Sequence, residues 1–269
     1  MKKRKQKKNF LSVVIPSYKQ EKTIKKDLKR IVKTLEANKY RYEVIVVIDG
    51  IVDKTVEKAK SLKLKKVKII GYKTNKGKGH AVRFGLKKAT GDIVSFIDAG
   101  MDLNPNGLSM LLEHFRWYNA DIIVGSKLHA ASKVSYPFHR KILSWGYRIL
   151  VRILFGLSIK DTQVGIKIYK KKVLEKVLPR LLVKTYAFDI EILAVAHRLG
   201  FKRIYEAPVE LEFRNNSSIA SKGFWSVITR MLWDTFAVFY RLKLIQYYDD
   251  KNKRLWKYDK ELKYKVNLP

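Results

Sequence analysis

The chain has 269 residues, of which 46% are hydrophobic and 12% aromatic, so it can bury the core of one large domain or two small ones. It carries 58 lysines and arginines against 24 aspartates and glutamates, a net charge of +34 that favours polyanionic partners such as nucleic acid, anionic lipid or phosphorylated substrates. Cysteine is absent, which excludes disulfides, thiolate metal sites and cysteine nucleophiles.

The beginning of the chain is strongly basic. The stretch MKKRKQKK is followed by no apolar segment of signal-peptide type. No uncharged run approaches the roughly 18 residues that a membrane span needs. We therefore expect a basic tail over residues 1–9 and a soluble or peripheral protein, without a signal peptide or a transmembrane segment.

Apolar runs alternate with helical periodicity along the first half of the chain. The apolar runs predict buried strands at 10–18, 42–50, 66–72, 92–98 and 120–126. The segments between them predict helices at 21–38, at 53–62, at 75–91 after a glycine-rich turn, and from Pro105 onward. This alternation predicts an α/β fold with a mainly parallel central sheet and helices on both faces. Ligands bind such sheets beyond the carboxyl ends of the strands.

The second half is less regular. It predicts a helix at 137–157, a strand followed by a helix at 164–178, a helix at 188–200, a strand pair or bent strand at 201–213, and an amphipathic helix at 223–243. We expect one domain over 10–222 that includes the helix at 137–157. A C-terminal unit over 223–269 would hold the last helix and a basic tail.

Two carboxylates follow the fourth predicted strand in the stretch SFIDAGMDLNP. Asp98 and Asp102 stand four residues apart, with Gly100 halfway between them. Carboxylates at a strand end can hold a hard cation such as Mg²⁺. The alternative is a plain turn, in which Asp102 only caps the segment that follows.

The stretch NKGKGHAV, which starts at Asn75, places backbone N–H groups and Lys78 at a helix N-terminus. That arrangement suits a phosphate group. The glycine spacing matches neither the dinucleotide-binding fingerprint nor the Walker loop, so a phosphate turn of another type or a purely structural turn remains.

Two helices have the pattern of helices that lie in a membrane interface. In the helix at 137–157, Lys141, Arg148 and Arg152 share one face, whereas Trp145 and three isoleucines lie on another. The helix at 223–243 repeats the pattern with several aromatic residues. We expect both helices to contact an anionic membrane surface from the cytoplasmic side, in a peripheral protein. The alternative is that both pack into the core or into a dimer interface.

Six segments, taken in order, resemble family 2 glycosyltransferases of the GT-A fold. They are VVIPSYKQE, VIVVIDGIVDKT, NKGKGHAVRFGLKKATGDIVSFIDA, DIIVGSK, DTQVGIKIY and AFDIEILAVAHRLGFKRIYEAPVE. The resemblance covers about residues 10–245. DTQVGIKIY followed by FDIEIL tilts it toward the branch of dolichyl- and polyprenyl-phosphate β-glucosyltransferases, with the phosphate-mannose synthases as more distant relatives.

The resemblance implies a site for a nucleotide-diphosphate sugar. The residues implied in binding it are Pro16, Tyr18, Asp49, Asn75, Lys78 and Asp98. It also implies a Mg²⁺ or Mn²⁺ ion that neutralises charge on the leaving diphosphate. Asp98 would bind that ion, because it matches the first carboxylate of the family's Asp-x-Asp motif. Gly100 occupies the second position, so Asp102 would replace the missing ligand directly or through water.

The acceptor side is also implied by the resemblance. Asp161 and Gln163 are expected to border the donor sugar and the metal. Asp189 would act as a general base toward a hydroxyl acceptor, or would position sugar hydroxyls if the acceptor is a phosphate. The residues expected to meet the acceptor phosphate or lipid are Ser126, Lys127, Arg140, Arg148 and Lys222.

The leading hypothesis is therefore an inverting enzyme that moves glucose, or else mannose, from a nucleotide-diphosphate sugar (UDP-glucose first) to polyprenyl or dolichyl phosphate. A second hypothesis is a family 2 transferase that acts on a hydroxyl with Asp189 as base. A third is a catalytically degenerate protein that only binds membrane or polyanions, with Gly100 as its main support. Nucleic acid is not an expected partner, because no recognition motif is present, and a homo-oligomer is compatible with the pattern.

Overall fold

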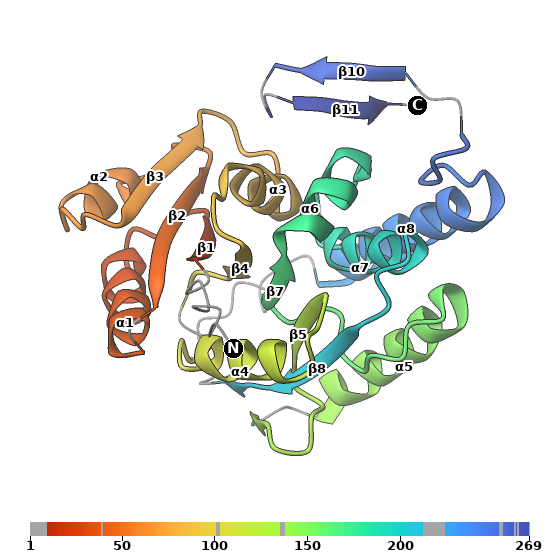
Figure 1. Ribbon diagram of the computed structural model, residues 1–269, viewed down its shortest axis with the longest axis horizontal. Coiled ribbons are helices and arrows are strands. Elements are labelled where there is room, and N and C mark those ends of the chain that lie inside the picture. Colours follow the sequence, from red (N-terminus) through yellow and green to blue (C-terminus); the bar gives the residue numbers. More distant parts are fainter. Residues whose placement is uncertain are drawn as a thin grey trace, which may run out of the picture.

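The computed structural model describes residues 10–38, 40–100, 103–134, 138–211, 224–252, 255–260, 262 and 264–268. Seven strands form the central sheet: β1 (Phe10–Ser17), β2 (Arg41–Asp49), β3 (Val67–Tyr72), β4 (Ile93–Ile97), β5 (Ile122–Ser126), β7 (Ile166–Lys170) and β8 (Ile204–Pro208). The main helices are α1 (Ile24–Ala37), α2 (Thr55–Lys60), α3 (Lys78–Lys88), α4 (Gly107–Trp117), α5 (Phe138–Phe155), α6 (Lys171–Val177), α7 (Phe188–Arg198) and α8 (Phe224–Phe239). The predicted α/β architecture with a mainly parallel sheet is confirmed (Figure 1).

The strand order is β3-β2-β1-β4-β7-β5-β8. Every described pairing in this sheet is parallel except those of β7, which runs antiparallel to both β4 and β5. The start of β7 therefore meets the end of β4, and Ile166 pairs with Ile97. As a result, the loop before β7 reaches the same edge of the sheet as the segments that follow the parallel strands.

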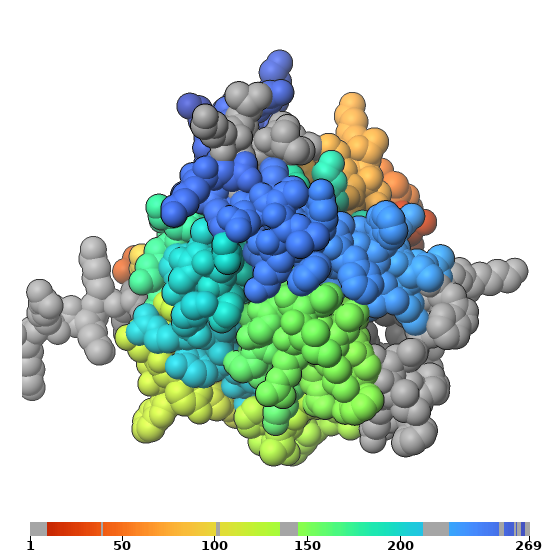
Figure 2. Space-filling model, turned by 90° about the vertical axis from the view of Figure 1, so that its right-hand side faces the viewer, coloured from red at the N-terminus to blue at the C-terminus, as the bar shows by residue number. Residues whose placement is uncertain are grey.

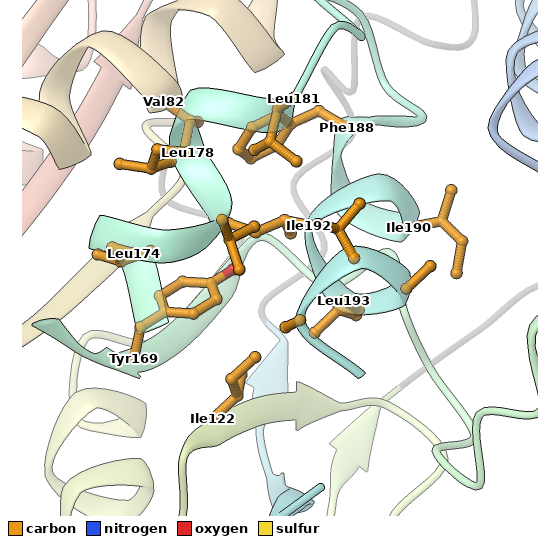
Figure 3. Packing of buried hydrophobic residues seen from close by; sticks show 14 of the residues in the cluster. Val82, Ile122, Tyr169, Leu174, Leu178, Leu181, Phe188, Ile190, Ile192 and Leu193 are labelled. Carbon is orange, nitrogen blue, oxygen red and sulfur yellow. The ribbon is translucent and has the colours of Figure 1, made fainter. Parts of the chain in front are cut away.

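Helices cover both faces of the sheet. Val13 and Ile15 of β1 belong to a core cluster with α1, α2 and α4, whereas Val14 between them belongs to a second cluster with α3 and α5 to α8. This alternation is what a strand buried on both faces requires. Figure 3 shows part of the second cluster, where Tyr169 of β7 lies near Leu174 of α6 and residues of α7.

The irregular second half also follows the predicted elements. The segment 201–213 contains β8 and the two-residue strand β9 (Glu210–Leu211), which pairs in parallel with β6 (Lys133–Val134). After α8 the chain continues through a π-helical turn at Tyr240–Leu244.

The C-terminal segment was expected to be a basic tail, but the structure places a two-stranded antiparallel hairpin there. It consists of β10 (Leu255–Asp259) and β11 (Tyr264–Leu268). Leu262 and Val266 are buried, and Phe84 of α3 packs against them. The segment looks like a tail in the sequence because it is rich in lysine and contains only a few apolar residues, and those few residues anchor it.

Candidate active site

Two pockets lie at the carboxyl edge of the sheet, near the loop at 159–165 that leads into β7. The first has a volume of about 560 Å³ and is lined by the ends of β1, β2 and β4, the glycine-rich turn and the start of α3. The second, of about 740 Å³, lies between α5, the loop after β5 and residues 159–163. The edge is the one where ligands of parallel sheets bind.

The first pocket brings together all six residues predicted to bind the donor. They are Pro16, Tyr18, Asp49, Asn75, Lys78 and Asp98. Other residues of the lining were not predicted from the sequence: Gln20, Lys76, Thr185, Tyr186 and Arg230. Thr185 and Arg230 come from segments more than 80 residues after Asp98, and no motif marks them. Thr185 Oγ1 donates a 2.5 Å hydrogen bond to Asp234 of α8, which ties that helix to the pocket.

Asp49 at the end of β2 organises the glycine-rich turn. Its carboxylate accepts hydrogen bonds from the backbone N–H of Lys76 (2.7 Å) and of Gly77 (3.1 Å), and from the side chain of Asn75 (3.1 Å). Gly77 has a φ of 98°, and a Cβ there would lie 2.6 Å from the carbonyl oxygen of Lys184. Only glycine fits this approach. Asp49 and glycine thus fix the turn that presents Lys78 at the start of α3.

Lys78 and Asp98 form an ion pair inside the pocket. Lys78 Nζ lies 2.8 Å from Asp98 Oδ2 and 3.5 Å from Asp189 Oδ2. Burial by itself would lower the pKa of Lys78, but the charges of Asp98 and Asp189 outweigh it and raise the pKa. Lys78 is therefore a permanent cation at the place where a donor diphosphate is expected.

The other carboxylate oxygen of Asp98 fits a metal ligand. Oδ1 is buried and has no hydrogen-bond partner among the described residues, which is costly unless a ligand satisfies it. The described part of the chain holds no group of three or more His, Cys, Asp or Glu residues that could hold a metal alone. One carboxylate together with phosphate oxygens and waters suits Mg²⁺ or Mn²⁺. The fit is thus to an ion shared between Asp98 and a diphosphate.

The position of the missing second carboxylate has its own backbone conformation. Gly100 has a φ of 110°, which residues with a Cβ rarely adopt. Its N–H donates a 3.1 Å hydrogen bond to Asp27 of α1, which holds the loop down. Position 100 is therefore shaped for glycine and not for an aspartate. Asp102, the predicted substitute ligand, lies outside the described residues.

Asp189 lies in the first turn of α7 and is 2% exposed. Its Oδ1 is 2.5 Å from the ammonium group of Lys167, which is fully buried and also donates to the carbonyl oxygen of Val164 at 2.7 Å. Burial lowers the pKa of Lys167, and the charge of Asp189 opposes that effect. A buried carboxylate held between two lysines is poorly placed to take a proton from a substrate.

The second pocket combines apolar walls with cations. Val151 and Trp145 of α5 line it together with Lys127 and Arg148. Asp161, Thr162 and Gln163 form another wall, so Asp161 and Gln163, which were expected to border the donor sugar and the metal, line this pocket and not the first one. Asp161 Oδ2 accepts from the backbone N–H of Lys127 at 3.1 Å, and Lys127 Nζ lies 3.6 Å away. A pocket of this kind suits a molecule with an anionic head and an apolar body.

Of the described residues predicted for the acceptor, Lys127 and Arg148 line this pocket and Ser126 does not. Ser126 is fully buried, and its Oγ accepts a hydrogen bond from the N–H of Leu128, so it shapes the loop and does not face the cavity. Arg140 is part of α5, but its side chain lies outside the described part. Lys222 lies outside it entirely.

An exposed apolar surface adjoins the second pocket. On α5, Ile153 is 75% exposed and Trp145 57%; on α8, Trp233 is 77% exposed. Figure 2 shows the two helices side by side on one face, and Tyr147 of α5 is hydrogen-bonded to Thr235 of α8 at 2.9 Å. Among the residues that the structure describes, no helix is both long enough and apolar enough to span a membrane.

Comparison with known proteins gives this arrangement a family. The model described as Glycosyl transferase family 2 matches residues 12–178. The dolichyl-phosphate beta-glucosyltransferase of Drosophila melanogaster is 32% identical over 247 residues, which cover 86% of this chain and 74% of that protein. The human dolichyl-phosphate beta-glucosyltransferase is 32% identical over 235 residues, which cover 80% and 71% of the two chains.

Solved structures agree on the fold. A crystal structure of glucosyl-3-phosphoglycerate synthase from Mycobacterium tuberculosis, in complex with Mn²⁺, uridine diphosphate and phosphoglyceric acid, matches with a TM-score of 0.63 and 20% identity over 97% of this chain and 87% of that chain. The same enzyme with Mg²⁺ and uridine diphosphate matches with a TM-score of 0.60 and 18% identity, over 97% and 88%. The GT-A fold expected from the sequence is confirmed, and the chain belongs to glycosyltransferase family 2.

Proposed function

We propose that this glycosyltransferase moves glucose from UDP-glucose to a dolichyl or polyprenyl phosphate at a membrane surface, with inversion at the anomeric carbon. The observation that carries the proposal is the pair of pockets beside one loop. One is polar and holds Lys78 and Asp98, and the other joins an apolar wall to Lys127 and Arg148. The relatives with 32% identity are named for the same reaction class.

The donor would lie in the first pocket with its nucleoside toward Pro16 and Tyr18 and its diphosphate over the start of α3. Lys78 and the N–H groups of the glycine-rich turn supply positive charge at that point. Asp98 would hold a Mg²⁺ or Mn²⁺ ion through its unpartnered Oδ1. When bound, such an ion neutralises charge that develops on the leaving diphosphate.

The acceptor phosphate would lie in the second pocket, near Lys127 and Arg148. In the transfer, a phosphate oxygen forms a bond to the anomeric carbon while the bond from that carbon to the nucleoside diphosphate breaks. A phosphate monoester is already ionised near neutral pH, so the reaction needs no general base. The proposal therefore agrees with the burial of Asp189 between Lys78 and Lys167, which does not favour the hydroxyl-acceptor alternative.

A membrane contact through α5 and α8 would bring the enzyme to its lipid acceptor. Exposed aromatic and aliphatic side chains on both helices lie close to exposed cations, among them Arg152 and Lys243. Cations near an anionic leaflet contribute about 1 kcal/mol each, and buried apolar area adds to this. The second pocket opens beside these helices, so an acceptor could enter from the lipid side with its chain still in the bilayer.

Transfer of labelled sugar tests the proposal. UDP-glucose and, in parallel, GDP-mannose are incubated with dolichyl phosphate in detergent, with Mn²⁺ or Mg²⁺ and then with EDTA. Free dolichol, which lacks the phosphate, serves as the matched acceptor control. We expect a metal-dependent glucolipid from UDP-glucose and dolichyl phosphate alone.

Other outcomes identify the alternatives. Product from GDP-mannose would show that the transferred sugar is mannose and not glucose. Product on dolichol would favour a hydroxyl acceptor. The absence of any product, combined with no binding of either donor by calorimetry, would leave a protein that uses its charge only to bind membrane or polyanions.

A further inference from the structure

Four charged side chains of alternating sign run from the interior of the protein into the donor pocket. Lys167 contacts Asp189 at 2.5 Å, Asp189 contacts Lys78 at 3.5 Å, and Lys78 contacts Asp98 at 2.8 Å. The exposed fraction of these side chains rises along the row, from 0% at Lys167 to 35% at Asp98. Only the outer end of the row can therefore be reached by a ligand.

The row is electrically balanced as it stands, with two ammonium groups and two carboxylates. A divalent ion added at Asp98 would lie beside the ammonium group of Lys78, and like charges at such distances repel. A donor diphosphate adds negative charge at the same place and would remove that imbalance. Binding of the metal should therefore raise the affinity for the donor, and binding of the donor should raise the affinity for the metal. Lys78 is the group that couples the two.

We infer that Lys78 is a resident counter-ion of Asp98 that competes with the divalent metal, and that donor binding draws Lys78 onto the diphosphate and so frees Asp98 for the ion. The inference rests on the proposed donor but not on the acceptor. It also gives a reason why one carboxylate is enough at this site. In the donor-free protein, Lys78 neutralises Asp98. In the complex, Lys78 would neutralise the diphosphate, and Asp98 alone would then be the carboxylate that holds the ion.

Asp189 and Lys167 keep the free-energy cost of this exchange low. When Lys78 leaves Asp98, Asp189 keeps Lys167 as a close partner, and Lys167 remains fixed to the carbonyl oxygen of Val164 at 2.7 Å. No buried carboxylate is left without a cation. Asp189 is thus a positioning residue that keeps the Lys78 ammonium group near the pocket. It does not itself touch the substrate.

Direct metal binding tests the inference without any enzymatic turnover. Binding of Mn²⁺ to the donor-free protein is measured by calorimetry and by the electron paramagnetic resonance signal of free Mn²⁺, for the wild type, Lys78→Met and Lys78→Arg. Lys73→Met is the matched control, because it removes the same charge from the exposed segment just before the turn. Melting curves establish that each variant is folded.

We expect Lys78→Met to bind Mn²⁺ about 10-fold more tightly than the wild type, a coupling of ordinary size. Lys78→Arg and Lys73→Met should stay within about 3-fold of the wild type. In EDTA, Lys78→Met should bind UDP about 10-fold more weakly. Unchanged or weaker Mn²⁺ binding by Lys78→Met would overturn the inference.

A measurement on the wild type keeps the inference testable if Lys78→Met does not fold. In EDTA, the wild type should bind UDP at least about 10-fold more tightly than uridine, because Lys78 meets the diphosphate without metal. Equal affinities would refute the exchange. Failure of sugar transfer to a lipid phosphate, with these binding results intact, would refute the proposed acceptor and leave the inference standing.

Discussion

Gly165 leaves the space that the Asp98 carboxylate occupies. A Cβ at position 165 would lie 1.9 Å from Asp98 Oδ2 and 2.3 Å from its Cγ, which no pair of non-bonded atoms can tolerate. The backbone of Asp98 is tied to the same residue, because its N–H donates a 2.8 Å hydrogen bond to the carbonyl oxygen of Gly165. The two residues therefore position each other, 67 positions apart in the sequence.

Gly165→Ala should displace the Asp98 side chain and lower the transfer rate by about 100-fold or more, because a misplacement of about 1 Å within a catalytic site has an effect of that size. The comparison is Gly107→Ala at the start of α4, where a Cβ would meet only Ile166 Cδ1 at 3.6 Å. Transfer rates and Mn²⁺ affinity in the presence of UDP measure the effect. Equal activity of both variants would show that Asp98 does not need its present position.

Asp189→Asn should destabilise the protein by about 3–5 kcal/mol, because it leaves the buried Lys167 ammonium group without its carboxylate. Unfolding in urea measures the loss. Glu57→Gln on the exposed side of α2 should change stability by less than about 0.5 kcal/mol.

The same Asp189 variant separates a structural role from a role as base. A general base would leave its pKa in the pH dependence of kcat/KM, and the variant would then lose that dependence while remaining stable. We expect a stability loss together with an unchanged shape of the pH profile for a phosphate acceptor. A stable variant with a flattened profile would contradict this.

Glu43 should make the stability of the fold depend on acid pH. Burial would raise the pKa of Glu43, but hydrogen bonds from Lys68, Thr90 and Ser12 outweigh it and lower the pKa to about 2. The ionised form is thus favoured in the folded state, against a pKa near 4.5 when unfolded. Its contribution, on the order of 2–3 kcal/mol, is complete above about pH 5 and is lost as pH falls from about 4.5 toward 2.

The free energy of unfolding, measured from pH 6 down to pH 3, should therefore fall more steeply in the wild type than in Glu43→Gln. The exposed Glu57→Gln should follow the wild type over the same range. Parallel curves for the wild type and Glu43→Gln would mean that Glu43 is not held in its ionised form by the fold.

The double variant Trp233→Glu with Phe236→Glu should weaken binding to anionic vesicles by about 10-fold or more, since each large apolar side chain contributes about 1.5–3 kcal/mol when buried. Both side chains are exposed on α8. The matched control is Trp117→Glu, because Trp117 is 86% exposed on α4, which covers the opposite face of the sheet.

Co-sedimentation with vesicles measures the change, and UDP binding should be the same in all variants. If the control and the α8 variant lose vesicle binding equally, the contact is nonspecific and follows net charge. If neither loses it, the exposed surface of α5 and α8 does not face a membrane.

The alternating first half of the fold was predictable because its signal is local. Leu108, Leu111, Leu112 and Phe115 share a helical face in the sequence, and all four are buried in the structure. The place of β7 was not predictable in this way. Its sequence indicates a strand, but nothing in it says that the strand enters between β4 and β5 with reversed direction. The C-terminal hairpin escaped for a related reason, since only two of its residues are described as buried in the core.

The residues of the candidate site fall into the same two groups, those with a local sequence signal and those without one. Asp98 and Lys78 were identified because strand ends and glycine-rich turns have recognisable patterns. Lys167 was not, because a lysine in a strand of a lysine-rich chain gives no sign that it is fully buried beside Asp189. Arg230 was missed because its neighbourhood is set by tertiary packing of α8 and not by any motif.

The loop that leads into β7 has a consequence for how such an enzyme can diversify. Residues 161–163 form a wall of the second pocket, while Gly165, two positions later, supports Asp98 in the first. The second pocket is otherwise lined by α5 and the loop after β5, and the first by the ends of β1, β2 and β4, the glycine-rich turn and the start of α3. Exchange of segments 127–134 and 138–155 between relatives should therefore change what the second pocket binds and leave the first pocket intact, provided that the loop at 161–165 keeps its length.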